Sequence, residues 1–148
     1  MDNQDLIAFL KSAKSLKETY IRSIDIKNDF CLLPVSRAHL NNSELIKDLC
    51  DWRNRYVNSY PSRFTATIES TSNWLLERVI NDPARILFLV TSPTGRVYGH
   101  MGLANVMKTS SFIELDNILK GDEEAPRNLF LQAFEALISW SLDTLNLQ

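Results

Sequence analysis

Apolar residues recur along the first 27 positions at the spacing of an amphipathic helix. They fall three or four positions apart, while lysine and glutamate occupy the opposite face. The apolar set is Leu6, Leu10, Ala13, Leu16, Tyr20, Ile21 and Ile24, and the polar set is Lys11, Lys14, Lys17 and Glu18. The pattern predicts one long helix. It favours an extension packed on the domain or on a second subunit over an element that lies on a membrane surface.

A strand and two helices follow in the pattern. The apolar run at 30–35 predicts a strand, which Pro34 either confines to a sheet edge or ends, because proline lacks an N–H. Asn41 and Glu44 predict a capping box. The helix behind that box has apolar residues at helical spacing, namely Leu45, Leu49, Trp52 and Tyr56. After a loop at 59–62, a second helix is predicted at 68–80, and Asn81-Asp82-Pro83 ends it.

The second half of the chain predicts an antiparallel meander. Residues 85–91 and 96–106 form two strands around the turn Ser92-Pro93-Thr94-Gly95. Gly99 and Gly102 in the longer strand indicate a bulge or a close approach of the backbone.

The meander continues into a strand, a loop and a helix. A third strand is predicted at 111–120, and a loop at 121–125 follows it. Pro126 opens the last helix, whose apolar face carries Phe130, Ala133, Phe134, Leu137, Ile138 and Leu145.

The composition then narrows the class of protein. The chain has 148 residues, of which 45% are hydrophobic and 23% charged, as expected for one globular domain. A net charge of −2 does not match a nucleic-acid binder, and no apolar run approaches the roughly 18 residues of a membrane span. We therefore expect neither a nucleic acid nor a membrane as partner. The acidic start and only two cysteines, Cys31 and Cys50, predict a cytoplasmic protein without a disulfide framework.

Several common kinds of site have no motif in the sequence. His39 and His100 stand alone, without other ligands at zinc-site spacing, so no metal site is predicted and each histidine is expected to be structural. Neither a GxSxG elbow nor a phosphate-binding GxxxxGK[ST] loop is present.

Three stretches carry a resemblance to a known superfamily. Residues 49–54, Leu-Cys-Asp-Trp-Arg-Asn, are similar to a helix end that reads WRN. Trp74-Leu75 precedes the apolar strands at 86–90 and 97–103. Residues 113–121, Ile-Glu-Leu-Asp-Asn-Ile-Leu-Lys-Gly, are similar to a fourth-strand signature that reads EIDNxxRG. In this order, residues 29–145 resemble the GNAT superfamily of N-acyltransferases, in branches related to amino-sugar and small-amine acetyltransferases.

The resemblance implies a fold and a domain organisation. We expect an α/β (α+β) fold with a GNAT-like mixed sheet, in which helices flank an antiparallel meander. Residues 1–28 would be an N-terminal helical extension and 29–148 the acyl-CoA-binding domain. Because family members continue into further strands after the last helix, the resemblance implies that the C-terminal strands are missing here and that this form alone has weak or no activity.

The resemblance also implies an activity and a co-substrate. It predicts an N-acyltransferase that moves an acyl group from acetyl-CoA, or another acyl-CoA, to a primary amine of a small molecule or amino-sugar. The strand end Ile118, Leu119 and Lys120 would hold the pantetheine arm. Lys120-Gly121 partly matches the family's phosphate loop, and the backbone N–H groups of Arg127, Asn128 and Leu129 would hold the pyrophosphate. Asp122, Glu123 and Glu124 depart from the family's loop. They either face solvent or weaken the binding of the cofactor.

Five polar side chains are candidates for chemistry and recognition. Glu114 and Asp116 lie two apart on one strand and share a face, so repulsion would raise the pKa of one towards that of a general base. Alternatively, they pair with lysine or arginine across the sheet. Arg53 and Asn54 would orient the acceptor, or simply complete a helix end. Asn117 is a further substrate-binding candidate, although it lies on the opposite face and would then rather fix the backbone.

Two rival functions fit the same sequence. One is a non-catalytic GNAT-like module that regulates or assembles a larger enzyme through its open sheet edge and its N-terminal helix. The other is an unrelated interaction domain that dimerises through that helix. A homo-oligomer is expected because an open strand edge beside uncovered apolar surface favours pairing with another chain.

Overall fold

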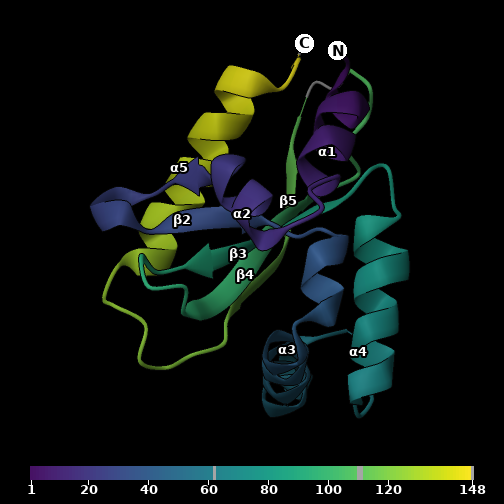
Figure 1. Cartoon of the computed structure of the whole chain (residues 1–148), viewed down its shortest axis with the longest axis vertical. Helices are drawn as coiled ribbons and strands as arrows, with labels where there is room; N and C mark the ends of the chain where they lie inside the picture. The colour runs from purple at the N-terminus through teal and green to yellow at the C-terminus, as the bar shows by residue number, and fades with distance from the viewer. Residues whose placement is uncertain (62, 110–111, 148) are drawn as a thin grey trace.

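The computed structural model describes residues 1–61, 63–109 and 112–147, and its centre is a sheet between two layers of helices (Figure 1). The described strands pair in chain order and number five: β1 (Ile24–Asp25), β2 (Cys31–Pro34), β3 (Ile86–Thr91), β4 (Val97–Ala104) and β5 (Glu114–Lys120). The α+β class and the meander are confirmed. The prediction of a mixed sheet is wrong for these strands, because every described pair is antiparallel and no crossover joins them.

Helices cover both faces of the sheet. The face covered by α1 (Asn3–Lys11) and α5 (Leu129–Thr144) is called the α5 face, and it holds Ile7, Phe88 and Leu137 in one core. The opposite, α3 face is covered by α3 (Ser43–Arg55) and α4 (Ile68–Trp74), with Leu87 and Leu89 in a second core. Strand side chains alternate between faces, so β3 is buried at every position and apolar from Ile86 to Val90 to serve both cores.

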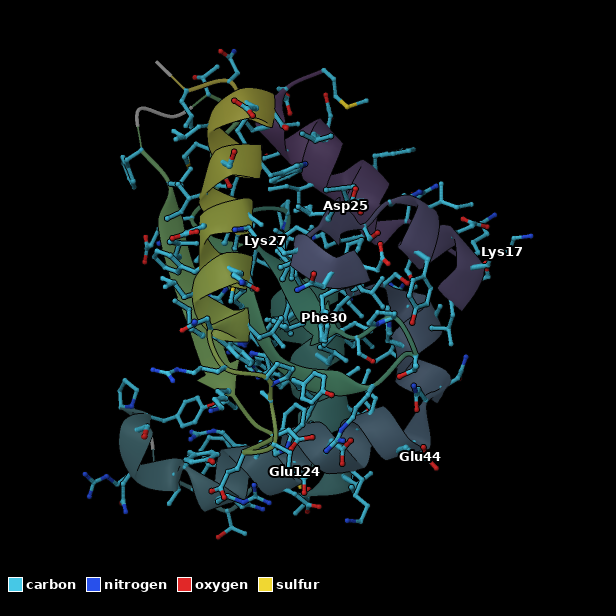
Figure 2. All side chains as sticks on the ribbon, turned by 90° about the vertical axis from the view of Figure 1, so that its left-hand side faces the viewer. Lys17, Asp25, Lys27, Phe30, Glu44 and Glu124 are labelled. Atoms are coloured by element: carbon cyan, nitrogen blue, oxygen red, sulfur yellow. The ribbon has the colours of Figure 1, made fainter. Side chains whose placement is uncertain are left out.

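The first 27 residues form two helices and a short strand where one helix was predicted. Between α1 and α2 (Leu16–Ile21), the Ser12 hydroxyl donates to the carbonyl of Phe9 over 2.7 Å, and Ser15 caps α2 by accepting from the Glu18 N–H over 3.2 Å. Serine favours such caps over helix interiors, so the chain turns here. Lys17 stays on the exposed side of α2 (Figure 2).

Lys11 ties α1 to the middle of the chain. It was assigned to the polar face of the predicted helix, but only 7% of it is exposed. Its Nζ donates to the carbonyls of Val79, Asp82 and Arg85 over 3.2, 2.6 and 2.7 Å. Burial lowers the pKa of Lys11 to about 8, although the charge of Asp82 acts in the opposite direction.

A second tie joins α1 to the far end of the described chain. The side-chain amide of Asn3 donates to the carbonyl of Asn146 over 3.2 Å, and its Oδ1 accepts from the Asn146 N–H over 2.7 Å. Asn3 is 2% exposed, so both amide groups are satisfied inside the protein.

The ends of β2, α3 and the second helix can be compared with the caps and breaks predicted from the sequence. The cap of α3 is Asn42, whose Oδ1 accepts from the Leu45 N–H over 3.1 Å, so the box predicted at Asn41 lies one position too early. Pro34 ends β2 as predicted. The second helix spans the predicted range, but its last part, Leu75–Ile80, is π-helical before Asn81 ends it.

The last helix starts later than predicted. Helix α5 begins at Leu129, because the Leu129 N–H donates to the Pro126 carbonyl over 3.1 Å in a turn. Asn128 then adopts a left-handed conformation with a φ of 66° before the helix starts.

A bulge interrupts the pairing of β4 with β5. Two residues of β5, Asn117 and Ile118, face the single residue Met101, and Asn117 has a φ of 50°. The glycines of β4 instead mark a close approach of the backbone. A Cβ on Gly99 would overlap the Leu119 carbonyl oxygen, and one on Gly102 would overlap that of Ile86. The predicted start of β5 at Ser111 lies outside the described residues.

Candidate functional site

A cavity of about 170 Å³ lies between the α3 face of the sheet and the helices that cover it. Side chains from α3, the loop before α4, α4 itself, β4 and β5 converge on it. The lining residues are Leu49, Arg53, Tyr60, Phe64, Ala66, Ser70, Thr71, Trp74, His100 and Asn117. A mainly apolar cavity with a few converging polar groups is typical of a small-molecule site.

Arg53 brings a positive charge to this cavity. It lies in the last turn of α3, whose buried face carries Leu49 and Trp52. Its guanidinium carbon lies 3.6 Å from the centroid of the Tyr60 ring and 4.6 Å from that of Phe64. Both distances are within the range of cation–π attraction, so the rings hold the side chain of Arg53 at the cavity.

Asn54 fixes the loop that carries these rings. Its Oδ1 accepts from the Ala66 N–H over 2.7 Å, and its Nδ2 donates to the Ala66 carbonyl over 3.0 Å. Both ends of the amide therefore bind one backbone residue, and Asn54 is not part of the lining. Of the predicted substrate-binding residues, Arg53 and Asn117 line the cavity and Asn54 supports it from behind.

His100 is the buried polar group of the sheet wall. It is 4% exposed, and its Nδ1 lies 2.5 Å from the carbonyl oxygen of Asn117. Since a carbonyl only accepts, Nδ1 carries the hydrogen and Nε2 of the neutral ring is left as an acceptor. Burial lowers the pKa of His100 to about 4, although the bond to Asn117 opposes this shift. The imidazole is therefore neutral near pH 7.

The bulge explains how Asn117 both binds His100 and lines the cavity. In an ideal strand, Asn117 would point away from the face that carries Asp116. The left-handed turn at Asn117 instead places its carbonyl against His100 and its side chain in the cavity lining. Asparagine tolerates this conformation better than most residues, because its short side chain makes local hydrogen bonds.

Glu114 and Asp116 share the α3 face, as their spacing predicts, but neither lines the cavity. They pair across the sheet with Ala104 and Gly102. A nitrogen of Arg85 lies 3.4 Å from Oδ2 of Asp116, which is the cross-sheet pairing named as the alternative. Burial raises the pKa of Asp116, and the charge of Glu114 adds to this rise while Arg85 opposes it. Oδ1 of Asp116 is buried without a hydrogen-bond partner in the described structure.

The residues predicted to bind the cofactor follow the edge of the sheet. Ile118 and Lys120 are exposed on β5, and Leu119 packs against the core of the α3 face. Gly121 ends the strand beneath Trp52, where any Cβ would overlap the indole ring. Arg127 and Asn128 are exposed ahead of α5, whereas the N–H of Leu129 already donates to Pro126.

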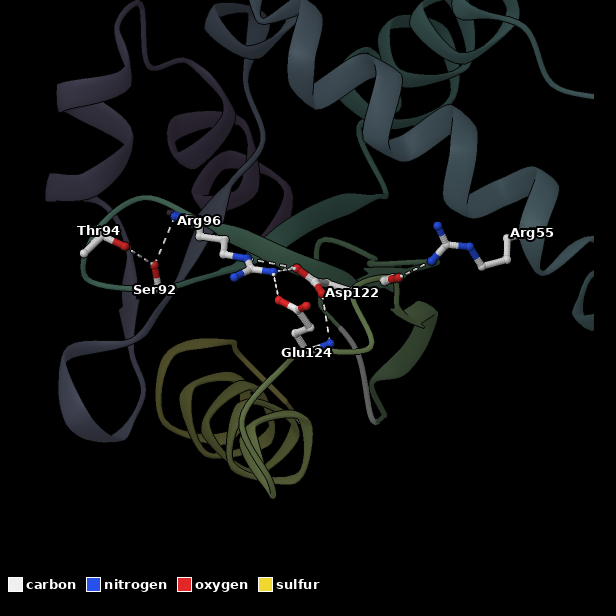
Figure 3. Close-up of polar contacts among 7 residues, drawn as sticks. Arg55, Ser92, Thr94, Arg96, Asp122 and Glu124 are labelled. Carbon is white, nitrogen blue, oxygen red and sulfur yellow. Dashed lines mark hydrogen bonds and ion pairs between the residues drawn. The ribbon is translucent and has the colours of Figure 1, made fainter.

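The acidic loop after β5 turns the carboxylates of Asp122 and Glu124 towards Arg96 (Figure 3), whereas Glu123 accepts from the Tyr56 hydroxyl over 3.5 Å. Nitrogen Nη2 of Arg96 lies 2.6 Å from Oδ2 of Asp122 and 2.9 Å from Oε2 of Glu124, while Arg55 donates to the Gly121 carbonyl over 3.2 Å. Burial acts to raise the pKa of Asp122, but the Glu124 N–H and Arg96 outweigh it and lower that pKa. The loop is thus organised by internal pairs.

Most backbone donors of this loop are also engaged. The N–H groups of Gly121 and Asp122 both donate to the Tyr98 carbonyl, over 3.0 and 2.9 Å. Those of Glu124 and Ala125 donate to Oδ1 and the carbonyl of Asp122, over 2.9 and 3.1 Å. A phosphate that binds here would need the N–H groups of the exposed segment before α5.

Comparison with known proteins adds no relative. No family model, curated protein or solved structure matches the chain significantly. Within the described residues, no group of three or more His, Cys, Asp or Glu side chains is placed to hold a metal ion, and no helix has the length and apolar character to cross a membrane. The choice of function therefore depends on the geometry of the cavity and of β5.

Sequence reasoning missed part of this site. His100 was expected to be a structural residue, which its buried hydrogen bond to Asn117 agrees with, but its place in the cavity lining was not predicted. Tyr60 and Phe64 lie in a loop without periodicity, so only the fold shows that they meet Arg53. Trp74 was quoted only for the resemblance, and the fold places it in the lining.

Proposed function

We propose that this chain is an acyl-CoA-dependent N-acyltransferase domain that acylates a primary amine of a small molecule. One observation carries the proposal: Asn117 belongs both to the cavity lining and to β5, the edge strand of the described sheet. A donor that follows β5 would therefore end beside an amine held in the cavity.

The edge strand suits an amide-rich arm. An edge strand has unpaired N–H and C=O groups on its outer side, and an extended ligand can bind them as an added strand. The pantetheine arm of coenzyme A has two amides that can do so. Exposed Lys120 at the end of β5 would add a positive charge near the phosphates.

The cavity suits a neutral amine. No aspartate or glutamate occurs among its described lining residues, so nothing there favours an ammonium ion. Nε2 of His100 and the side chain of Asn117 would accept hydrogen bonds from the amine. The amine nitrogen would then attack the thioester carbon, forming the C–N bond and breaking the C–S bond. The surplus amine proton would pass to the departing thiolate.

The predicted base chemistry is a variant of this mechanism. Asp116 and Glu114 lie on the strand that carries Asn117, and the raised pKa of Asp116 suits a group that takes up a proton. If a side chain removes the proton, Asp116 is our choice. A double variant, Glu114→Gln with Asp116→Asn, should then lose roughly 10²–10⁴-fold in rate. Full activity in this variant would exclude both carboxylates as the base. The amine proton would then pass to the departing thiolate, as described above.

A second function is favoured by the acidic loop. Arg96 pairs with Asp122 and Glu124, and the engaged N–H groups leave few donors for a pyrophosphate. These observations favour a non-catalytic module of the same fold, which would assemble with other chains through β5. In the N-terminal region, α1 buries Ile7 and Leu10 against the domain, whereas α2 exposes Leu16, Tyr20 and Ile21 and is a second candidate contact.

Calorimetry with CoA and acetyl-CoA separates the two functions. The acyltransferase should bind both ligands, and Lys120→Glu should weaken binding while the exposed control Lys17→Glu should not. A coupled assay of thiol release with a panel of amines then tests turnover. A folded protein that binds no CoA at millimolar concentration would end the acyltransferase proposal. The same absence of binding would support the non-catalytic module, whose acidic loop leaves few donors for a pyrophosphate.

A further inference from the structure

We infer that the cavity takes an amine that also carries a carboxylate, of the size of an α-amino acid, with the carboxylate on Arg53 and the amine at His100. This inference deepens the proposed function, because it names the class of the acceptor. It rests on the proposed function for the acyl donor and on the lining of the cavity for the acceptor, and the two can be tested separately.

The carboxylate end is assigned from the charge of the lining. Among the ten described lining residues, Arg53 carries the formal charge, since His100 is neutral near pH 7. Tyr60 and Phe64 contact the guanidinium through their rings and hold it at the cavity. A guanidinium has five N–H donors in one plane, and two of them match the two oxygens of a carboxylate. An anionic group in the ligand would therefore bind at this end.

The size of the cavity limits the rest of the ligand. A volume of about 170 Å³ is close to that of an apolar cavity that holds one benzene ring, roughly 150 Å³. A nucleotide or a disaccharide is much larger. A carboxylate, an amine and a short apolar side chain against Trp74 would fill the available space.

The amine end is assigned from the acceptors on the sheet wall. His100 offers Nε2 because its Nδ1 is held by the Asn117 carbonyl. Thr71 adds a hydroxyl group to the same lining, whereas that of Ser70 is already paired with the backbone of Thr67. An amine held by His100 lies next to Asn117 on β5, which is where the acyl group is proposed to arrive.

The test begins with matched ligands and the wild-type protein without CoA. Leucine, isoamylamine, which lacks the carboxylate, and phosphoethanolamine, which carries a phosphate in its place and lacks the apolar side chain, are titrated by NMR or calorimetry. We expect leucine to bind at least ten-fold more tightly than either of the others. Equal binding of leucine and isoamylamine would overturn the inference, and so would preference for phosphoethanolamine.

Variants then assign the two ends of the ligand. Arg53→Met should abolish the preference for leucine over isoamylamine, Arg53→Lys should keep part of it, and the exposed control Arg37→Met should keep all of it. His100→Asn should weaken both ligands alike, because both carry the amine. An unchanged preference in folded Arg53→Met would overturn the assignment of the carboxylate.

The inference and the proposed function can fail separately. If leucine binds with the expected preference but is never acylated, the inference holds and the acyltransferase proposal fails. If amines without a carboxylate are acylated as efficiently as amino acids, the transferase stands and the inference fails.

Discussion

The buried imidazole of His100 should make stability depend on pH in a defined window. Its pKa is about 4 in the folded protein, against 6.5 for the exposed side chain of an unfolded chain. Between these values the unfolded chain binds a proton that the folded protein does not, so stability falls as the pH falls. The contribution is fully present above pH 6.5 and is lost progressively as the pH approaches 4.

The size of the loss follows from the two pKa values. Linkage gives about 2 kcal/mol lost between pH 7 and pH 5, and about 3 kcal/mol by pH 4. Other groups add their own dependence, namely His39, whose pKa burial also lowers, and carboxylates at the acidic end. A variant without the imidazole therefore isolates the share of His100.

The measurement compares urea unfolding of three proteins at half-unit steps from pH 7 to pH 4. His100→Asn retains a donor for the Asn117 carbonyl but does not titrate, so its stability should fall by about 2 kcal/mol less than wild type between pH 7 and pH 5. Met101→Ala is the control, because it removes a fully buried neighbour and leaves both histidines in place. The slope of its unfolding free energy against pH should match that of wild type. An unchanged slope in His100→Asn would refute a depressed pKa at this position.

Three further changes test contacts elsewhere in the fold. Lys11→Met should cost roughly 2–4 kcal/mol in urea unfolding, because it leaves three carbonyls without their donor, while Lys14→Met on the exposed side should change little. Gly121→Ala should lower the thermal midpoint by several degrees, because the new methyl group overlaps Trp52. Arg96→Gln should lower the stability only slightly, since Arg96 and Glu124 are exposed and water screens their charges, and added salt should reduce that difference.

The strongly periodic parts of the fold could be predicted from the sequence. The meander, the second helix and the end of β2 at Pro34 follow from alternation, turn residues and the missing N–H of proline. The N-terminal region could not, because an apolar stripe continues across Ser12 and Ser15, whose hydroxyl groups end one helix and start the next. Hydrophobic periodicity indicates which side of a helix is apolar, but it does not indicate where local hydrogen bonds end the helix.

The candidate site was less predictable because it depends on distant contacts. Arg53 and Asn117 were identified, but their meeting depends on a bulge and on a loop held 12 residues away by Asn54. The left-handed turn at Asn117 reverses the face that simple alternation assigns to it. His100 is found only when the register of β4 and β5 places its ring beside the Asn117 carbonyl.

The ties of α1 set an order for folding during synthesis. Lys11 must wait for carbonyls 68 to 74 positions further along the chain, and Asn3 for a partner 143 positions away. At ribosomal rates of 5–20 residues per second, the first helix would remain undocked for about 7–30 s. Docking of α1 would thus wait for its distant partners, with the apolar side of Ile7 and Leu10 open to chaperones until then.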